Sequence, residues 1–439
     1  MADWSTAVES SAWPTSAWWQ AYQAPALGLL LQRARSSNLD LATSAAQLLQ
    51  ADAQLRQTGA SLLPQVSGST SVGRSESRNT TQTSSDRNTY SAALNASYEV
   101  DFWGRNRAAV AAARATLRAT RFDRETLALS IDASVASTWL QWLETHERLA
   151  LARRSLDNSE RVLQLIEARQ RFGAADRLEV SQQRTLVLQL QASLPTLEQS
   201  ELQLRNALAI LIGNPPGADL PRPIALSNVA VPDIGAGLPA ALLARRPDIR
   251  ASEARLAAAN ANLTAARAAL YPSIQLTGQF GVQSLALSGL VNDPASTWNL
   301  LAGLTQPIFQ GGRLRAQVDL SEAQQQELLV DYQRTLLQAL EEADTTLGAV
   351  SRVRSRFILL DQANDEARRA FELAETRYRA GAITQQALLD TQRTWYQSQD
   401  TLVQQRSAWL QATVDLFRAL GGGWQEAAVS YAEPFRSGE

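Results

Sequence analysis

The chain has 439 residues, enough for two or three domains, and its hydrophobic fraction of 45% is that of a folded protein. The formal net charge is −2, so no strong basic field indicates a nucleic-acid partner. There is no cysteine and one histidine, His146, which largely excludes thiol catalysis, zinc sites built from Cys or paired His, and Ser-His triads. We therefore expect no enzyme, no catalytic residue, no cofactor and no metal site, and we interpret His146 as a solvated helix residue.

Two kinds of periodicity follow one another along the chain. Apolar residues recur every three or four positions in long segments, which predicts helices. Shorter segments alternate polar and apolar residues, which predicts strands. In chain order, we expect an N-terminal arm over 1–37, a helix over 39–63, strands over 65–73 and 90–102, helices over 105–171 and 176–213, a linker over 214–237, a helix over 247–271, strands over 273–283 and 297–307, and helices over 311–380 and 383–421.

The order of these elements is the same in both halves because the sequence is duplicated. Residues 38–64 match residues 246–272 without gaps at an offset of 208, with Asp40 at the place of Asp248 and Pro64 at the place of Pro272. Tandem similarity of this kind is typical of one structural unit used twice. The expected domains are the arm 1–37, a first repeat over 38–213, the linker 214–237, a second repeat over 238–423 and a C-terminal tail over 424–439.

The segment YPSIQLTGQFGV, residues 271–282, shows why the strands point to a membrane. Ile274, Leu276, Phe280 and Val282 fall on one face, and polar side chains fall on the other. Each strand is about 10 residues long, which is the length that spans a bilayer when tilted. The polar segment 74–88 is expected as a long external connection. Four strands cannot close a barrel and open edges are excluded from hydrocarbon, so three chains are expected to form twelve strands.

A water-soluble sheet would alternate in the same way, so a soluble coiled-coil scaffold of the cell envelope remains an alternative at this stage. The two functions differ in a simple property. A barrel protein requires detergent for extraction and exposes residues 91–101 and 273–283 to lipid, whereas a scaffold does neither.

Five segments in combination give the chain a likeness to a known family. They are LLARRPDIRASEARL (242–256), YPSIQLTGQFG (271–281), QPIFQGGRLRAQV (306–318), RYRAGA (377–382) and ALGGGW (419–424). With these motifs the chain resembles the TolC-like outer-membrane factors, in the OprM/NodT branch of efflux lipoproteins. The resemblance implies a mainly α-helical chain with four strands of a membrane β-barrel, a homotrimer with a twelve-stranded barrel and a periplasmic helical tunnel, and an equatorial domain at the linker.

The same resemblance implies the function and the partners. The chain would be the outer-membrane exit channel of a tripartite efflux pump that conducts small molecules passively. Its partners would be outer-membrane lipid, a periplasmic membrane-fusion adaptor and an inner-membrane transporter of the RND type, and most of the chain would lie in the periplasm. The exit duct of a type I protein-secretion system is the alternative within transport. The branch carries a lipid-modified N-terminal cysteine, and we expect that anchor in the native protein although this sequence contains no cysteine.

The family closes its tunnel at the periplasmic tip, where pairs of helices turn. Asp390 and Arg393 match the family's acidic and basic gate residues, and Gln386 stands where this branch has a constricting leucine. The first turn, RFGAADRLEV, is shorter than the family's usual RxRAG pattern, so adaptor docking at this turn is expected to differ. The residues expected to contact the adaptor are Arg171, Phe172 and Gly173 in the first turn, and Arg377, Tyr378, Ala380 and Gly381 in the second.

Overall fold

The computed structural model describes residues 15–78, 84–232, 246–292 and 294–424. The start of the expected N-terminal arm, the last residues of the linker and the C-terminal tail beyond residue 424 lie outside the described residues. The chain divides into two compact units. One comprises Met1–Ala45, Asp123–Ile249 and Thr335–Glu439, and the other comprises Ala46–Phe122 and Arg250–Arg334.

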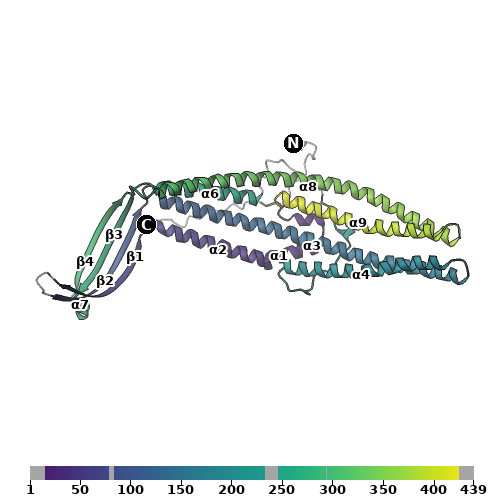
Figure 1. Cartoon of the computed structure of the whole chain (residues 1–439), viewed down its shortest axis with the longest axis horizontal. Coiled ribbons are helices and arrows are strands. Elements are labelled where there is room, and N and C mark those ends of the chain that lie inside the picture. The colour runs from purple at the N-terminus through teal and green to yellow at the C-terminus, as the bar shows by residue number, and fades with distance from the viewer. Residues whose placement is uncertain (1–14, 79–83, 233–245, 293, 425–439) are drawn as a thin grey trace. The chain divides into compact units, whose positions relative to one another are not determined.

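The second unit contains one antiparallel sheet of four strands in the order β1-β2-β3-β4 (Figure 1). Strands from both sequence repeats are therefore combined in one sheet, because β2 of the first repeat pairs with β3 of the second. The described strands are β1 (Gln65–Arg78), β2 (Ser84–Val100), β3 (Ser273–Ser284) and β4 (Ala295–Thr305).

The connection between β1 and β2 is shorter than expected. The polar segment 74–88, expected as a loop, mostly continues the two strands, and Arg74 pairs with Asn88 and Arg78 with Ser84. The segment contains no proline, and the ladder continues from the pair Arg74–Asn88 to the pair Arg78–Ser84. Polarity alone was a poor indication of a loop here.

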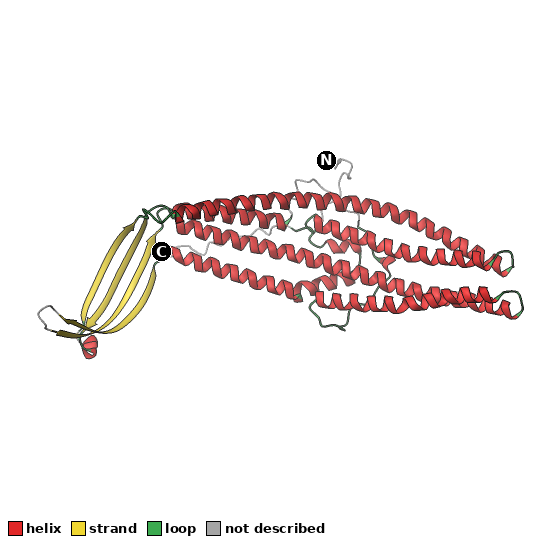
Figure 2. Ribbon diagram, viewed as in Figure 1, coloured by secondary structure: helices red, strands yellow, loops and turns green. Residues whose placement is uncertain are grey.

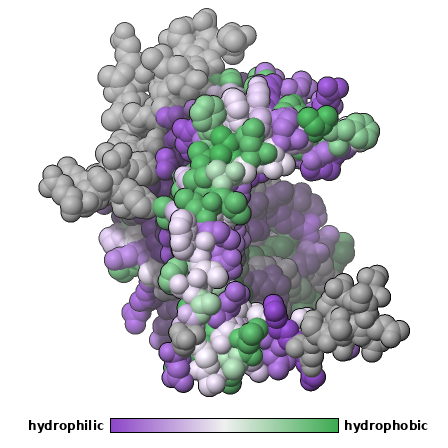
Figure 3. Space-filling model, turned by 90° about the vertical axis from the view of Figure 1, so that its left-hand side faces the viewer, coloured by the Kyte–Doolittle hydropathy of each residue, from purple (hydrophilic) through white to green (hydrophobic). Residues whose placement is uncertain are grey.

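The register brings like side chains together on each face of the sheet. Leu94, Phe280 and Trp298 are directly paired across β2, β3 and β4, and they are 57%, 59% and 79% exposed. The view toward the sheet in Figure 3 shows hydrophobic residues gathered in a band between polar ones. The next row, on the opposite face, consists of Ser67, Asn95, Gln279 and Asn299.

The remaining elements are helices, which make up most of the chain (Figure 2). The two longest helices have 67 residues each, or about 100 Å at the α-helical rise. Both long helices and both helices that follow them begin and end 208 residues apart, so the duplication extends to element boundaries. The described α-helices are α1 (Pro25–Ser37), α2 (Leu39–Gly59), α3 (Arg105–Arg171), α4 (Arg177–Leu211), α6 (Pro247–Ala268), α7 (Leu287–Asn292), α8 (Arg313–Arg379) and α9 (Gln385–Ala419).

Two of these helices were not expected from the sequence. The short α7 lies in the connection between β3 and β4, and α1 forms part of the N-terminal segment, preceded by a 3-10 turn over Trp18–Tyr22. Proline at the first position of α1 suits a helix start, and Asn38 then caps α2 by accepting hydrogen bonds from the backbone N–H groups of Asp40 and Leu41. No helix within the described ranges combines the length and the apolar composition needed to cross a membrane.

The main core of the first unit lies where the N-terminal segment meets α3 and α9. Trp18 stacks on Phe417 of α9 with ring centroids 5.0 Å apart, and the buried Tyr22 hydroxyl lies 2.7 Å from Oγ1 of Thr413. Buried residues of this cluster include Leu27, Leu30, Leu31, Trp139, Leu140, Leu143 and Leu410. Burial of this many large apolar side chains fixes the N-terminal segment on the helices.

His146 has a structural role in this unit that the sequence did not indicate. Its Nδ1 lies 2.8 Å from Oε1 of Glu201, so the side chain joins α3 to α4. The side chain is 44% exposed, and the expectation of a plain solvated residue was wrong because Glu201, distant in sequence, comes alongside in the fold.

Candidate functional site

The expected site lies at the turns that end the helical pairs α3–α4 and α8–α9, which lie side by side in the first unit (Figure 2). Each turn contains a glycine with positive φ, Gly173 at 73° and Gly381 at 72°. Their N–H groups donate to the carbonyls of Gln170 and Tyr378, three residues back in each case. Glycine is the residue that adopts this backbone without strain, which is why both helices end there.

The two turns have the same length, although the first lacks the RxRAG letters. Five residues separate α3 from α4, and five separate α8 from α9. The next N–H group closes each turn on the helix, from Ala174 to the Arg169 carbonyl and from Ala382 to the Arg377 carbonyl, both at 2.8 Å. The letters of the two turns are a poor guide to turn length, because the two glycines occupy different places within RFGAAD and RYRAGA.

Each following helix begins with a side-chain cap. Oδ1 of Asp176 accepts a hydrogen bond from the Glu179 N–H at 2.9 Å, and Oγ1 of Thr384 accepts one from the Ala387 N–H at 3.4 Å. Such caps satisfy N–H groups that the helix leaves free. The backbone of each turn is thus defined on both sides by local hydrogen bonds.

The residues expected to contact a partner are mostly exposed on this surface. Phe172 is 88% exposed, which is unusual for a large aromatic side chain, and Leu178, in the first turn of α4, is 63% exposed. Tyr378 is different, because it is only 2% exposed. The other expected contact residues, all exposed, are Arg171, Gly173, Arg377, Ala380 and Gly381.

The buried Tyr378 connects the two helical pairs. Its hydroxyl donates to Oε2 of Glu179 at 2.9 Å, and its carbonyl accepts from Nη1 of Arg169 at 2.5 Å. The Arg169 guanidinium also lies 4.6 Å from the centre of the Tyr378 ring. Burial, together with the bond to the Glu179 carboxylate, raises the pKa of Tyr378 to about 12, so the hydroxyl stays protonated and remains a donor.

A second polar link lies deeper in the same interface. The Gln183 amide donates to Oγ of Ser159 at 3.0 Å and to Oε1 of Gln392 at 3.2 Å, and all three residues are buried. Gln392 in turn donates to the Tyr396 hydroxyl at 2.8 Å. The apolar residues around these links include Val162, Ile166, Val180, Phe371 and Leu388.

The expected gate residues lie together on an exposed face of α9. Nε2 of Gln386 donates to Oδ1 of Asp390 at 2.9 Å. The two residues are four apart in sequence, so they lie on neighbouring turns of the helix. Arg393 lies on the same helix and is exposed, and within the described part of the chain it forms no ion pair with Asp390. The acidic and basic residues are therefore both available to groups from outside the chain.

Glu179, Arg169 and Gln183 were not identified from the sequence. A weak signal existed for Gln183, because SQQRT in the first repeat resembles TQRT in the second, and Gln183 does meet Gln392. No signal existed for Glu179, whose partner Tyr378 lies 199 residues away. Contacts between the two helical pairs depend on how the repeats pack, which periodicity does not specify.

Comparison with known proteins accounts for this architecture. The family model described as "Outer membrane efflux protein" matches residues 30–214 and again residues 238–422, which agrees with the duplication. The pyoverdine export outer membrane protein OpmQ of Pseudomonas putida is 42% identical over 428 residues, covering 96% of this chain and 91% of OpmQ. The probable efflux pump outer membrane protein TtgC of Pseudomonas putida is 35% identical over 416 residues, covering 93% of this chain and 85% of TtgC.

The fold is also found among solved structures. The crystal structure of the Campylobacter jejuni CmeC outer membrane channel superposes with a TM-score of 0.88 at 26% identity. The superposition covers 96% of this chain and 91% of the CmeC chain. Nearly every described element therefore has a counterpart in a channel protein.

Proposed function

Because this chain belongs to the outer membrane efflux protein family, we propose that it works as a homotrimer that forms a passive exit duct for small molecules. The chain is an outer-membrane efflux channel protein, as its relatives and its fold show. The proposal adds the assembly, the gate and the partners.

The four-stranded sheet is the observation that supports the trimer. β1 and β4 are its two edges within the described residues, and a lipid-exposed edge would leave backbone N–H and C=O groups without partners. Pairing β4 of one copy with β1 of the next satisfies these groups. Three copies supply twelve strands, with rows such as Asn95, Gln279 and Asn299 toward water and rows such as Leu94, Phe280 and Trp298 toward lipid.

The gate of the proposed duct consists of Gln386, Asp390 and Arg393. Three Asp390 carboxylates around a threefold axis would form an acidic ring, and Arg393 guanidinium groups would bridge them. The bond between Gln386 and Asp390 orients the carboxylate in each copy. The link between Tyr378 and Glu179 would hold the α8–α9 pair against the α3–α4 pair in the closed state.

The exposed side chains of the two turns support the proposed partners. An adaptor that covers Phe172 and Leu178 would bury apolar surface now in contact with water, and this would favour its docking at the turn. We propose a periplasmic membrane-fusion adaptor in this role and an inner-membrane RND-type transporter behind it. In this arrangement most of the chain lies in the periplasm, and a lipid anchor at the N-terminus tethers it to the outer membrane.

The cargo is proposed to be small molecules rather than proteins. OpmQ is named for pyoverdine export and TtgC for efflux, and both match this chain over more than nine-tenths of its length. A conduit of this kind needs no chemistry of its own, and the described residues contain no group of three or more His, Cys, Asp and Glu side chains that could hold a metal ion.

Single-channel conductance in a planar bilayer tests the duct and its gate together. Wild-type protein purified in detergent is expected to insert and show a small conductance, and the double variant Asp390→Ala/Arg393→Ala is expected to show a much larger one. Insertion with unchanged conductance would keep the duct and reject this gate. A protein that never inserts would contradict the duct itself.

A further inference from the structure

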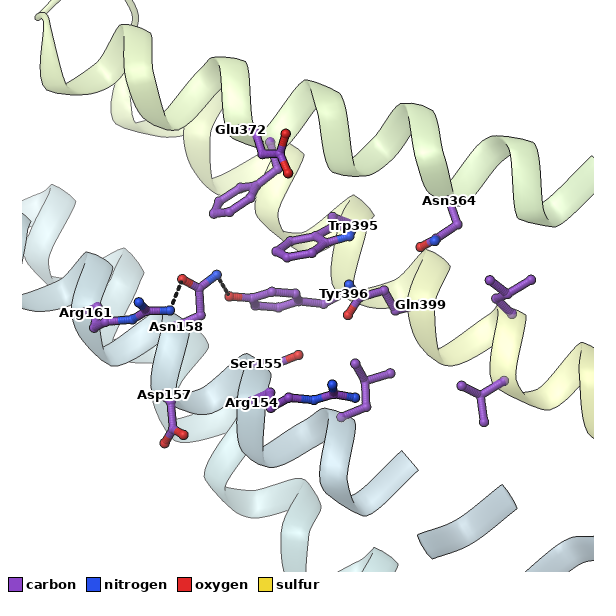
Figure 4. Close-up of a pocket in the computed structure, with 14 residues that line it drawn as sticks. Arg154, Ser155, Asp157, Asn158, Arg161, Asn364, Glu372, Trp395, Tyr396 and Gln399 are labelled. Carbon is purple, nitrogen blue, oxygen red and sulfur yellow. Dashed lines mark hydrogen bonds between the residues drawn. The ribbon is translucent and has the colours of Figure 1, made fainter. Parts of the chain in front are cut away.

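A cavity of about 710 Å³ lies in the helical unit, among α3, α8 and α9 (Figure 4). Sites for small organic molecules have volumes of roughly 300–1,000 Å³, so a ring system with one or two substituents would fit. None of the residues assigned above to the gate or to partner contact lines this cavity. The proposed duct therefore gives this cavity no role.

One wall of the cavity is aromatic. The Phe371 and Trp395 rings are stacked, with centroids 5.0 Å apart and an angle of 18° between their planes. The Tyr396 ring lies next to Trp395 with centroids 5.6 Å apart. Leu151, Leu402 and Val403 complete the apolar surface. A flat apolar ligand would add to this stack and exclude water from it.

Two hydrogen-bond donors in this wall have no acceptor among the described residues. Nε1 of Trp395 is shielded from solvent and has no partner. The Tyr396 oxygen already accepts from Nδ2 of Asn158 at 2.9 Å and from Nε2 of Gln392 at 2.8 Å, so its own hydrogen is left to donate. Nε1 is covered by protein atoms, so a ligand in the cavity does not reach it, and the Tyr396 hydroxyl is the donor that remains.

Two arginines and two acidic residues line the cavity. Arg154 lines it and forms no ion pair within the described parts of the chain, and Figure 4 shows its side chain reaching in beside the aromatic residues. Arg161 donates to Oδ1 of Asn158 and adds a second positive charge. Of the two acidic lining residues, Asp157 extends away from the rings in Figure 4, and Glu372 is exposed, as both arginines are.

We propose that this cavity binds a small aromatic carboxylate. The ring lies against Trp395 and Tyr396, and the carboxylate accepts hydrogen bonds from the Arg154 guanidinium. Because α3 belongs to one helical pair and α8 and α9 belong to the other, the ligand joins the two pairs. This site is separate from the proposed duct, and it can be tested without measuring conductance.

Calorimetric titration of the purified full-length protein with 2-naphthoate, in a non-ionic detergent, tests the proposal. We expect saturable binding of one molecule per chain. Arg154→Gln removes the charge and is expected to weaken binding by about tenfold or more, because hydrogen bonds to charged groups contribute about 1.5–3 kcal/mol. Trp395→Ala removes the ring on which the ligand is proposed to stack, and we expect binding several-fold weaker.

Arg153→Gln is the matched control, since this neighbouring arginine pairs with Glu198 at 2.8 Å and does not line the cavity. It should bind 2-naphthoate as the wild type does, and the neutral analogue 2-naphthalenemethanol should bind the wild type far more weakly than 2-naphthoate. Circular dichroism of each variant identifies any failure to fold. The proposal is overturned if 2-naphthoate shows no saturable binding, as when a partner protein or a second copy fills the cavity. It is equally overturned if folded Arg154→Gln and Trp395→Ala both bind like the wild type.

Discussion

The hydroxyl of Tyr378, near the end of α8, lies 2.9 Å from Oε2 of Glu179, in the first turn of α4. This single bond joins two helical pairs whose sequences are separated by nearly half the chain. Tyr378 is 2% exposed and Glu179 is half-buried, so the bond is partly protected from water. It is therefore positioned to oppose any motion that separates the two turns.

Removing the Tyr378 hydroxyl should loosen the turns. Tyr378→Phe keeps the buried ring and is expected to cost about 1 kcal/mol of stability, since one hydrogen bond is lost. In bilayers the variant should open more often than the wild type. Tyr332→Phe, which also removes a phenol from α8 but about 70 Å away along the helix, is the control. Equal open probabilities for all three proteins would show that the Tyr378 bond does not restrain the gate.

Any side chain at Gly381, the glycine of the second turn, should lower the stability of the protein. Gly381→Ala meets no atom within 4 Å, so its cost is that of the positive φ alone, about 1 kcal/mol. Gly59→Ala in α2 also has open space around it but lacks a positive φ, and it should be neutral or stabilising by up to about 1 kcal/mol. Thermal unfolding followed by circular dichroism measures both. A Gly381 variant as stable as the Gly59 variant would contradict the turn geometry.

The two faces of β3 should respond oppositely to charge. Phe280→Arg places a cation on the face proposed to contact lipid, where midplane arginine costs about 2–4 kcal/mol. Gln279→Arg, one residue earlier, places it on the face proposed to line water and should insert normally. The measurement is the fraction of protein recovered in outer membranes after expression. Equal recovery of both variants would argue against the assigned faces.

The buried Asp132 should give stability a pH dependence. Burial raises its pKa above 3.8 even though Arg35 binds both carboxylate oxygens. The folded chain therefore holds this proton more tightly than the unfolded chain does. Its contribution is full below pH 3.8 and is lost as the pH rises through the folded pKa. Stability of the wild type relative to Asp132→Asn should be greater at pH 4 than at pH 7, measured by thermal unfolding. A difference independent of pH would contradict the shift.

Much of the local structure could be predicted from the sequence. The expected start and end of the helix 105–171 agree with α3, and the alternation in 273–283 agrees with β3 to within one residue. Both features depend on periodicity, which is a property of neighbouring residues. Polarity was a weaker guide, since segment 74–88 is largely strand although its composition suggested a loop.

The candidate site was predicted only in part, and the missing part has one cause. Asp390 and Gln386 were identified from their motif, and their hydrogen bond joins adjacent turns of one helix. The roles of Glu179 and Arg169 depend on Tyr378, which belongs to the other repeat. A motif locates residues along one segment and does not specify which distant segment packs against it.

The sequence by itself determined the duplication, the helix and strand periods and the two faces of each strand, because these depend on spacing along the chain. Only the tertiary structure decided that β2 pairs with β3, that Tyr378 is buried against Glu179, and that Arg154 shares a cavity with Trp395. Those relationships join segments about 170–240 residues apart. They form when the two repeats bury their apolar surfaces against each other, and side-chain packing in three dimensions selects the partners.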